Sequence, residues 1–257
     1  MASQGTIDRL CGMRLSAMAH AYADQDSMPG VGAMTFDERL AQVVDAEWDS
    51  RRTNKRDRLP GQARLSCPEA RVADVRWDPD RKLDRPLVME LSNCTWVSDR
   101  RNVVITGATG SGKTWIACAL AAAACESFHT TRYVRMPQLM DELVVSRDEE
   151  WAKAKRRLEK VELLVIDDFM LEPLKGREAR ELLELVEARY RRGSLILCSQ
   201  YGPSGWHERI GEGALADAVI DRKCEASHLR SNAKSYVMRS PGRRARPGRS
   251  NAPANFA

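Results

Sequence analysis

The chain has 257 residues, a length that suits one core domain with a smaller appendage better than two full-size domains. With 43% hydrophobic and 30% charged residues, it can bury a core beneath a water-exposed surface. No run approaches the roughly 18 consecutive apolar residues of a membrane span, and the N-terminus lacks the basic-then-apolar pattern of a secretory signal, so we expect a cytoplasmic protein.

The N-terminal 60 residues are predicted to be helical. Thr35 and Glu38 are the ends of a capping box, in which the Thr35 hydroxyl accepts from the Glu38 backbone and the Glu38 carboxylate reaches back. An apolar face follows at helical spacing, formed by Leu40, Val43, Val44 and Trp48. The basic residues 51–58 continue this helix, and Pro60-Gly61 is expected to end it.

Apolar strands alternate with helical segments after residue 100, which predicts an α/β fold with a parallel sheet and helices on both faces. The predicted strands are residues 102–106, 133–136, 161–166 and 194–198. The predicted helices are an Ala-rich segment around residues 115–125 and residues 137–146, 149–160 and 176–192.

The seven cysteines are widely scattered, odd in number and free of any CxxC pair. A disulfide framework or a zinc site would need closer, paired spacing. We therefore expect buried, reduced thiols at all of them: Cys11, Cys67, Cys94, Cys118, Cys125, Cys198 and Cys224.

Basic residues gather in three segments, residues 51–58, 153–157 and 243–249. Together with the net charge of +5, they permit a polyanionic partner such as DNA. None of them alternates basic with aromatic residues, so phosphate contact on duplex DNA is a simpler hypothesis than stacking on exposed bases. The alternative for each segment is a solvated surface.

A glycine-rich turn joins the first predicted strand to the Ala-rich helix and matches G-x-x-x-x-G-K-[ST]. The glycines let the backbone N–H groups point inward, where they and the helix N-terminus can hold phosphate oxygens. Lys113 adds a positive charge for the β- and γ-phosphates, and the Thr114 hydroxyl is a candidate Mg²⁺ ligand. The predicted nucleotide-binding residues are Gly107, Ala108, Thr109, Gly110, Ser111, Gly112, Lys113 and Thr114.

Two carboxylates, Asp167 and Asp168, follow the apolar strand 161–166. The carboxyl ends of parallel strands face the ligand, which places Asp167 beside Mg²⁺ and lets Asp168 polarise the attacking water as a general base. Without the phosphate loop, a solvated Asp-Asp turn would be the better interpretation.

Several stretches beyond the phosphate loop resemble the IstB-type ATP-binding proteins, which are transposition helper ATPases of insertion sequences. That family is related to the DnaC helicase loader and the DnaA initiator within the AAA+ class. The resemblance covers residues 8 to 240, through TFDERLAQVVDAEWDSRR, LDRPLVMELSNCTWV, GATGSGKTWIACALAAAAC, LLVIDDF, ILCSQ, GWHERIGEGALADAVIDR and SYVMR. It implies a helical N-terminal region (1–65) for oligomerisation or DNA contact and an AAA+ ATPase domain (84–240), with a linker (66–83) between them. Residues 241–257 are rich in Pro, Gly, Arg, Asn and Ala and cannot bury a core, so we expect a disordered basic tail there.

The resemblance also implies roles that spacing alone does not give. Gln200 stands at the sensor 1 position, near the γ-phosphate or its water, where spacing alone suggests a strand-end polar residue. Arg222 matches an arginine finger acting on a neighbouring subunit's ATP, where spacing alone suggests a surface salt bridge. The implied partners are duplex DNA, a cognate transposase and further copies of the chain with ATP at their interfaces. The implied cofactors are ATP and Mg²⁺, with slow hydrolysis as the release step.

The chain departs from the family pattern at three points. The usual glycine after LLVIDDF is Met170, and the terminal S-x-R motif has Val237 in place of its arginine, with Arg239 as the nearest substitute. The water-polarising acid is the short Asp168, which favours slow hydrolysis. The alternatives to a transposition helper are a DnaC-like helicase loader, a P-loop kinase of a small metabolite and a non-hydrolysing binding module.

Overall fold

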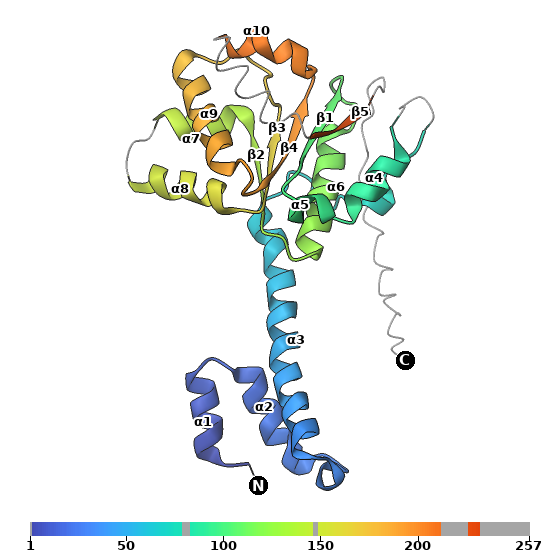
Figure 1. Ribbon diagram of the computed structural model, residues 1–257, viewed down its shortest axis with the longest axis vertical. Helices are drawn as coiled ribbons and strands as arrows, with labels where there is room; N and C mark the ends of the chain where they lie inside the picture. Colours follow the sequence, from blue (N-terminus) through green and yellow to red (C-terminus); the bar gives the residue numbers. More distant parts are fainter. Residues whose placement is uncertain (1, 79–82, 146–148, 212–225, 232–257) are drawn as a thin grey trace, which may run out of the picture.

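The computed structural model describes residues 2–78, 83–145, 149–211 and 226–231. A head built on a β-sheet is joined through one long helix to a small helical base (Figure 1). Among the described helices, none combines the length and apolar character that a membrane span requires.

The base consists of two short helices packed beside the start of a long one. These are α1 (Gln4–Gly12), α2 (Ser16–Asp24) and α3 (Phe36–Ala63), with single 3₁₀ turns at Gln25–Ser27 and Val31–Ala33. The predicted capping box of α3 is confirmed: the Thr35 hydroxyl accepts from the Glu38 N–H at 3.3 Å, and the Glu38 carboxylate accepts from the Thr35 N–H at 2.7 Å. This reciprocal pairing fixes where the long helix begins.

The predicted end of α3 is wrong. The helix passes through Pro60 and Gly61 and ends at Ala63, with Arg64 in the left-handed region at φ 51°. Leu59 and Ala63, four residues apart, are both buried in the head, and this burial offsets the cost of a proline in the last turn. The predicted apolar face is only partly buried, because Val43 is covered whereas its neighbours Leu40, Val44 and Trp48 are exposed.

The head contains a parallel five-stranded sheet with the strand order β2-β3-β4-β1-β5. Its strands are β1 (Asn102–Gly107), β2 (Thr131–Arg135), β3 (Leu163–Asp167), β4 (Ser194–Ser199) and β5 (Ala226–Ser231). The four predicted strands are confirmed with small shifts of their ends. The fifth was not predicted, because its sequence, ASHLRS, is polar and lacks the apolar run that marked the others.

Helices cover both faces of the sheet, as predicted (Figure 1). The helices of the head are α4 (Arg85–Ser92), α5 (Thr95–Ser98), α6 (Lys113–Glu126), α7 (Met136–Val145), α8 (Glu149–Lys160), α9 (Gly176–Arg189) and α10 (Trp206–Ile210), with 3₁₀ turns at Val72–Asp74 and Pro203–Gly205. α6 packs on one face together with α4 and the end of α3, and α7, α9 and α10 pack on the other. Successive strand residues alternate between these two cores, so both faces of the sheet are apolar.

The described cysteines are all free thiols, but they are not all buried as predicted. Cys11 is exposed and Cys67 is half-buried, and Cys224 lies outside the described residues. Burial raises the pKa values of the thiols of Cys94, Cys118, Cys125 and Cys198.

A buried arginine on α9 forms hydrogen bonds to the backbone next to the starts of β3 and β4. Arg189 is 1% exposed, and its guanidinium donates to the carbonyls of Leu158 at 2.5 Å, Val161 at 2.8 Å and Ser194 at 2.8 Å. Burial lowers its pKa to about 10. Since β3 carries Asp167, this arginine supports the strand that delivers the site carboxylate.

We expect Arg189→Met to lower the free energy of unfolding by about 3 kcal/mol or more, because several buried carbonyls lose their donor. Urea unfolding of the full chain measures this change, with Arg180→Met on the exposed side of the same helix as the control. A loss for Arg189→Met no larger than that of the control would contradict the supporting role of Arg189.

Candidate nucleotide site

The predicted phosphate loop connects the end of β1 to the start of α6. Gly110 and Gly112 adopt left-handed backbone angles, with φ 78° and 85°, which side chains with a Cβ disfavour. Ser111 between them is buried, whereas Ala108 and Thr109 are exposed. The loop therefore has the strand–turn–helix setting that a phosphate cradle requires, with the first N–H groups of α6 at its end.

Lys113 is the first residue of α6, and its ammonium folds back over the loop. Its Nζ donates to the carbonyl of Ala108 at 2.9 Å. Burial lowers the pKa of Lys113, although Asp167 and Asp168 nearby raise it. An anionic ligand in the loop would bring a further opposite charge beside this partly desolvated cation and stabilise its charged form.

Thr114 and Asp167 meet although they lie 53 residues apart in the chain. The Thr114 hydroxyl donates to Oδ2 of Asp167 at 2.7 Å, and the Tyr133 hydroxyl donates to the same oxygen at 2.8 Å. Asp167 is 3% exposed, and burial together with this carboxylate raises the pKa of Tyr133. A hydroxyl and a carboxylate side by side fit Mg²⁺, which prefers a few oxygen ligands and keeps its remaining positions for phosphates and water.

Asp168 follows β3 with a left-handed φ of 53° and lies beside Arg135 at the end of β2. Nε and Nη2 of Arg135 both donate to Oδ2 of Asp168, at 2.9 and 2.7 Å. The hydrogen bond to this carboxylate raises the pKa of Arg135. Both of these hydrogen bonds are accepted by Oδ2, and the side chain of Asp168 is 27% exposed.

The sequence analysis missed Tyr133 and Arg135. Both lie on β2, which is next to β3 in the sheet, and Val134 and Arg135 pair in register with Ile166 and Asp167. A polar residue at the end of an apolar strand was the available signal. It could be used only with the strand order known.

Gln200 follows β4 directly and is exposed. Its predecessor Ser199 pairs in register with Thr106, so Gln200 lies at the edge of the sheet where the phosphate loop leaves β1. The side chain of Ser199 is instead structural, donating to the Phe169 carbonyl at 2.7 Å and accepting from Trp206 at 3.2 Å.

Met170 is fully buried in the core and has a φ of 58°, the left-handed angle that a glycine there would adopt without cost. Three residues that the sequence analysis singled out lie outside the described residues: Arg222, Val237 and Arg239. The predicted basic tail also lies outside them.

A family model described as IstB-like ATP binding protein matches residues 9–243. The chain is 37% identical over 232 residues to the putative insertion sequence ATP-binding protein y4pL of Sinorhizobium fredii, covering 89% of this chain and 93% of that protein. It is 35% identical over 201 residues to the putative ATP-binding protein of insertion sequence IS1162 from Pseudomonas fluorescens, covering 78% and 87%.

Two solved structures share the fold of the head. DnaI superposes with a TM-score of 0.56 at 18% identity, covering 63% of this chain and 91% of that chain. AMPPCP-bound DnaA from Aquifex aeolicus superposes with a TM-score of 0.54 at 18% identity, covering 65% and 51%. The head thus has the fold of the AAA+ P-loop ATPases, as the sequence predicted.

Proposed function

The chain belongs to the family of IstB-like ATP-binding proteins, and on this premise we propose that it is the helper ATPase of a transposition system. In this proposal it assembles on duplex DNA when ATP is bound, presents that DNA to a partner transposase and releases the DNA after hydrolysis. ATP lies between neighbouring copies of the chain. The insertion-sequence names of its relatives support the transposition setting.

The contact between Thr114 and Asp167 carries the enzymatic part of the proposal. It brings the hydroxyl at the helix end of the phosphate loop to the carboxylate at the end of β3, the pair of ligands that holds Mg²⁺ beside the phosphates in P-loop NTPases. When bound there, Mg²⁺ would be held by these two residues and would neutralise charge that develops on the phosphate oxygens.

In this proposal each remaining residue has its own task. Lys113 holds the phosphates, and Asp168 accepts the proton of the attacking water through Oδ1. Gln200 orients that water or the γ-phosphate from the end of β4. Arg222 reaches the ATP of the next copy and stabilises its transition state.

Measuring ATP turnover of the full chain with and without duplex DNA tests this function. We expect slow release of inorganic phosphate that changes when DNA is added. No phosphate release under any condition would favour a non-hydrolysing binding module, and transfer of phosphate to a small metabolite would favour a kinase. Stimulation by a replicative helicase rather than by DNA would favour a loader.

Mixing two inactive variants tests the shared site. Arg222→Ala is expected to bind ATP but hydrolyse it at least tenfold more slowly, since arginine fingers contribute roughly 10³ to 10⁵ in rate where they have been measured. Adding Lys113→Ala protein should partly restore turnover, because some interfaces then pair an intact loop with an intact finger. Arg177→Ala, on the exposed surface of α9, is the control. Mixed assemblies that show no recovery would contradict a finger acting between copies.

A further inference from the structure

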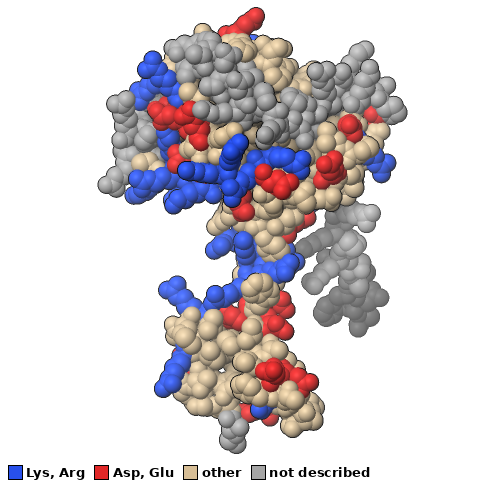
Figure 2. Space-filling view, viewed as in Figure 1, with Lys and Arg blue, Asp and Glu red and all other residues tan. Residues whose placement is uncertain are grey.

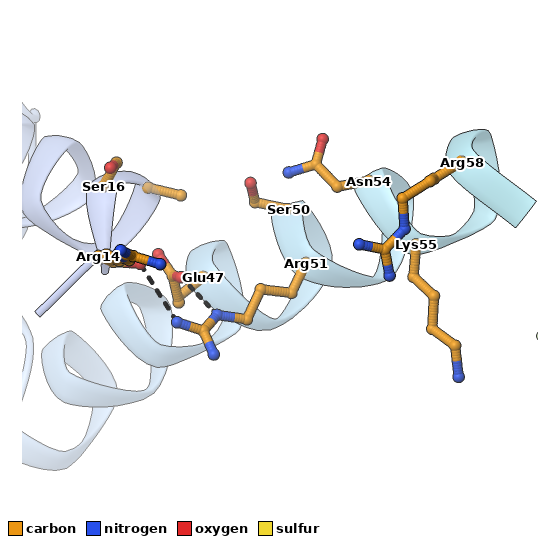
Figure 3. A pocket seen from close by; sticks show the side chains of 9 residues that line it. Arg14, Ser16, Glu47, Ser50, Arg51, Asn54, Lys55 and Arg58 are labelled. Atoms are coloured by element: carbon orange, nitrogen blue, oxygen red, sulfur yellow. Dashed lines mark hydrogen bonds and ion pairs between the residues drawn. The ribbon is translucent and has the colours of Figure 1, made fainter. Parts of the chain in front are cut away.

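An open pocket of about 450 Å³ lies in the base, between α3 and the turn that joins α1 to α2 (Figure 3). Four cationic residues line it: Arg14, Arg51, Lys55 and Arg58. The remaining lining is polar or small, including Ser50 and Asn54, and no aromatic side chain contributes. We call this feature the stalk pocket.

One carboxylate faces the four cations, and it is already engaged. Glu47 accepts from Nε of Arg51 at 2.7 Å and from the backbone N–H of Met18 at 3.1 Å, so it also caps the start of α2. These hydrogen bonds lower the pKa of Glu47, that from Arg51 most. Among the described residues no acidic group pairs with Arg14, Lys55 or Arg58, and the pocket keeps an excess of positive charge.

The structure divides the basic segment 51–58 into two faces. The guanidinium of Arg52 lies 4.7 Å from the centre of the Phe128 ring, so this residue ties α3 to the head. Lys55 lines the pocket but also reaches that ring, with its Nζ 6.0 Å from the ring centre. Arg51 and Arg58 lie on the pocket side, spread over about 10 Å of the helix. Cations spread along a helix suit an extended polyanion better than a compact one.

The second basic segment is less available than its sequence suggests. Lys155 is largely buried between two carboxylates of α9, at 3.2 Å from Glu181 and 2.6 Å from Glu184. Burial lowers the pKa of Lys155, but the hydrogen bonds that its ammonium donates to these two carboxylates, together with their charges, raise it above the ordinary value. Lys155 is therefore less available to DNA phosphates than a solvated lysine, because its ammonium is already paired with carboxylates inside the head.

More basic side chains continue from the stalk pocket to the head. Lys and Arg gather along α3 and under the head in Figure 2. Arg132 donates to the carbonyl of Gln62 at 3.5 Å, and burial together with the neighbouring charges of Arg64 and Arg157 lowers its pKa. Like charges that crowd together in this way repel each other unless a polyanion lies across them.

We propose that the stalk pocket holds backbone phosphates of duplex DNA, with Arg14 and Arg58 donating from opposite sides. The absence of aromatic lining leaves bases nothing to stack on, which favours backbone contact with a duplex over binding of a single strand. The assignment rests on the proposed DNA binding and adds where on the chain it occurs. It brings in Arg14, which lies outside every basic segment of the sequence.

The double variant Arg14→Gln/Arg58→Gln of the full chain tests the assignment. Affinity for a fluorescent duplex of arbitrary sequence is measured over a range of salt concentrations with an ATP analogue present. Each lost phosphate contact should flatten the slope of log affinity against log salt by about 0.9, so the double variant should lose roughly two units of slope. Duplexes of different sequence should weaken alike.

The matched control is Arg9→Gln/Arg56→Gln, which removes the same charge from exposed residues of α1 and α3 outside the pocket. Its slope should stay close to that of the unaltered protein. Equal slopes for both doubles would overturn the pocket assignment while leaving the proposed function standing. Tighter binding of single strands than of the duplex would contradict both the pocket assignment and the proposed assembly on duplex DNA. If the unaltered protein binds no DNA, the proposed function fails as well. If the double variant is unstable, Arg58→Gln alone replaces it in the test, and its slope of log affinity against log salt should flatten by about one unit.

Discussion

Replacing Lys113 with alanine is expected to abolish ATP binding or to weaken it by at least about 10- to 100-fold, the range that one charge-assisted hydrogen bond supplies. Its ammonium is the charged group of the loop itself, and it lies at the start of α6 beside the carbonyl of Ala108. The backbone N–H groups of the loop remain in the variant but carry no full charge. Titration of a fluorescent ATP analogue in the presence of Mg²⁺ measures the loss.

Lys160→Ala, which removes an exposed ammonium from α8, is the control and should bind nucleotide normally. Thermal unfolding without nucleotide should be similar for both variants, because Lys113 is not part of the apolar cores. Wild-type affinity in Lys113→Ala would mean that the loop does not hold the phosphates.

Replacing Asp168 with asparagine is expected to leave ATP binding intact and to slow hydrolysis by about 10²- to 10⁴-fold, the usual contribution of a general base. The amide keeps the size of the carboxylate but does not accept the proton of the attacking water. Asp168 is placed for this role by a left-handed backbone angle and by the two hydrogen bonds from Arg135. Single-turnover hydrolysis with saturating ATP separates the chemical step from binding.

The control for this second variant is Asp141→Asn on the exposed side of α7, which should hydrolyse ATP at the normal rate. If Asp168→Asn turns over ATP as fast as the unaltered protein, another group activates the water. If it loses ATP binding instead, Asp168 contributes to the ground state and the division of tasks between Asp167 and Asp168 is wrong.

Local signals in the sequence were sufficient to predict the phosphate loop and four of the five strands. Glycines at Gly110 and Gly112 meet a local backbone requirement, and apolar runs such as residues 161–166 need only be buried on both faces. Signals whose meaning depends on tertiary contacts were misread or missed. Pro60 normally ends a helix, but burial of Leu59 and Ala63 carries α3 past it.

The partners of the site carboxylates required knowledge of the strand order. Tyr133 and Arg135 reach Asp167 and Asp168 because β2 lies beside β3, and no spacing in the sequence encodes that neighbourhood. The charged segments show the same limit. Lys155 belongs to a basic run in the sequence, yet its charge is neutralised by Glu181 and Glu184 of another helix.

The affinity of the full chain for duplex DNA, compared between a non-hydrolysable ATP analogue and ADP with Mg²⁺ present, tests the central claim most directly. We expect clearly tighter binding with the analogue, because ATP between neighbouring copies favours the assembly that holds DNA. Lys113→Ala should bind DNA with the same affinity in the presence of the analogue and of ADP. Equal affinities of the unaltered protein with the analogue and with ADP would contradict a DNA-binding ATPase whose hydrolysis is the release step.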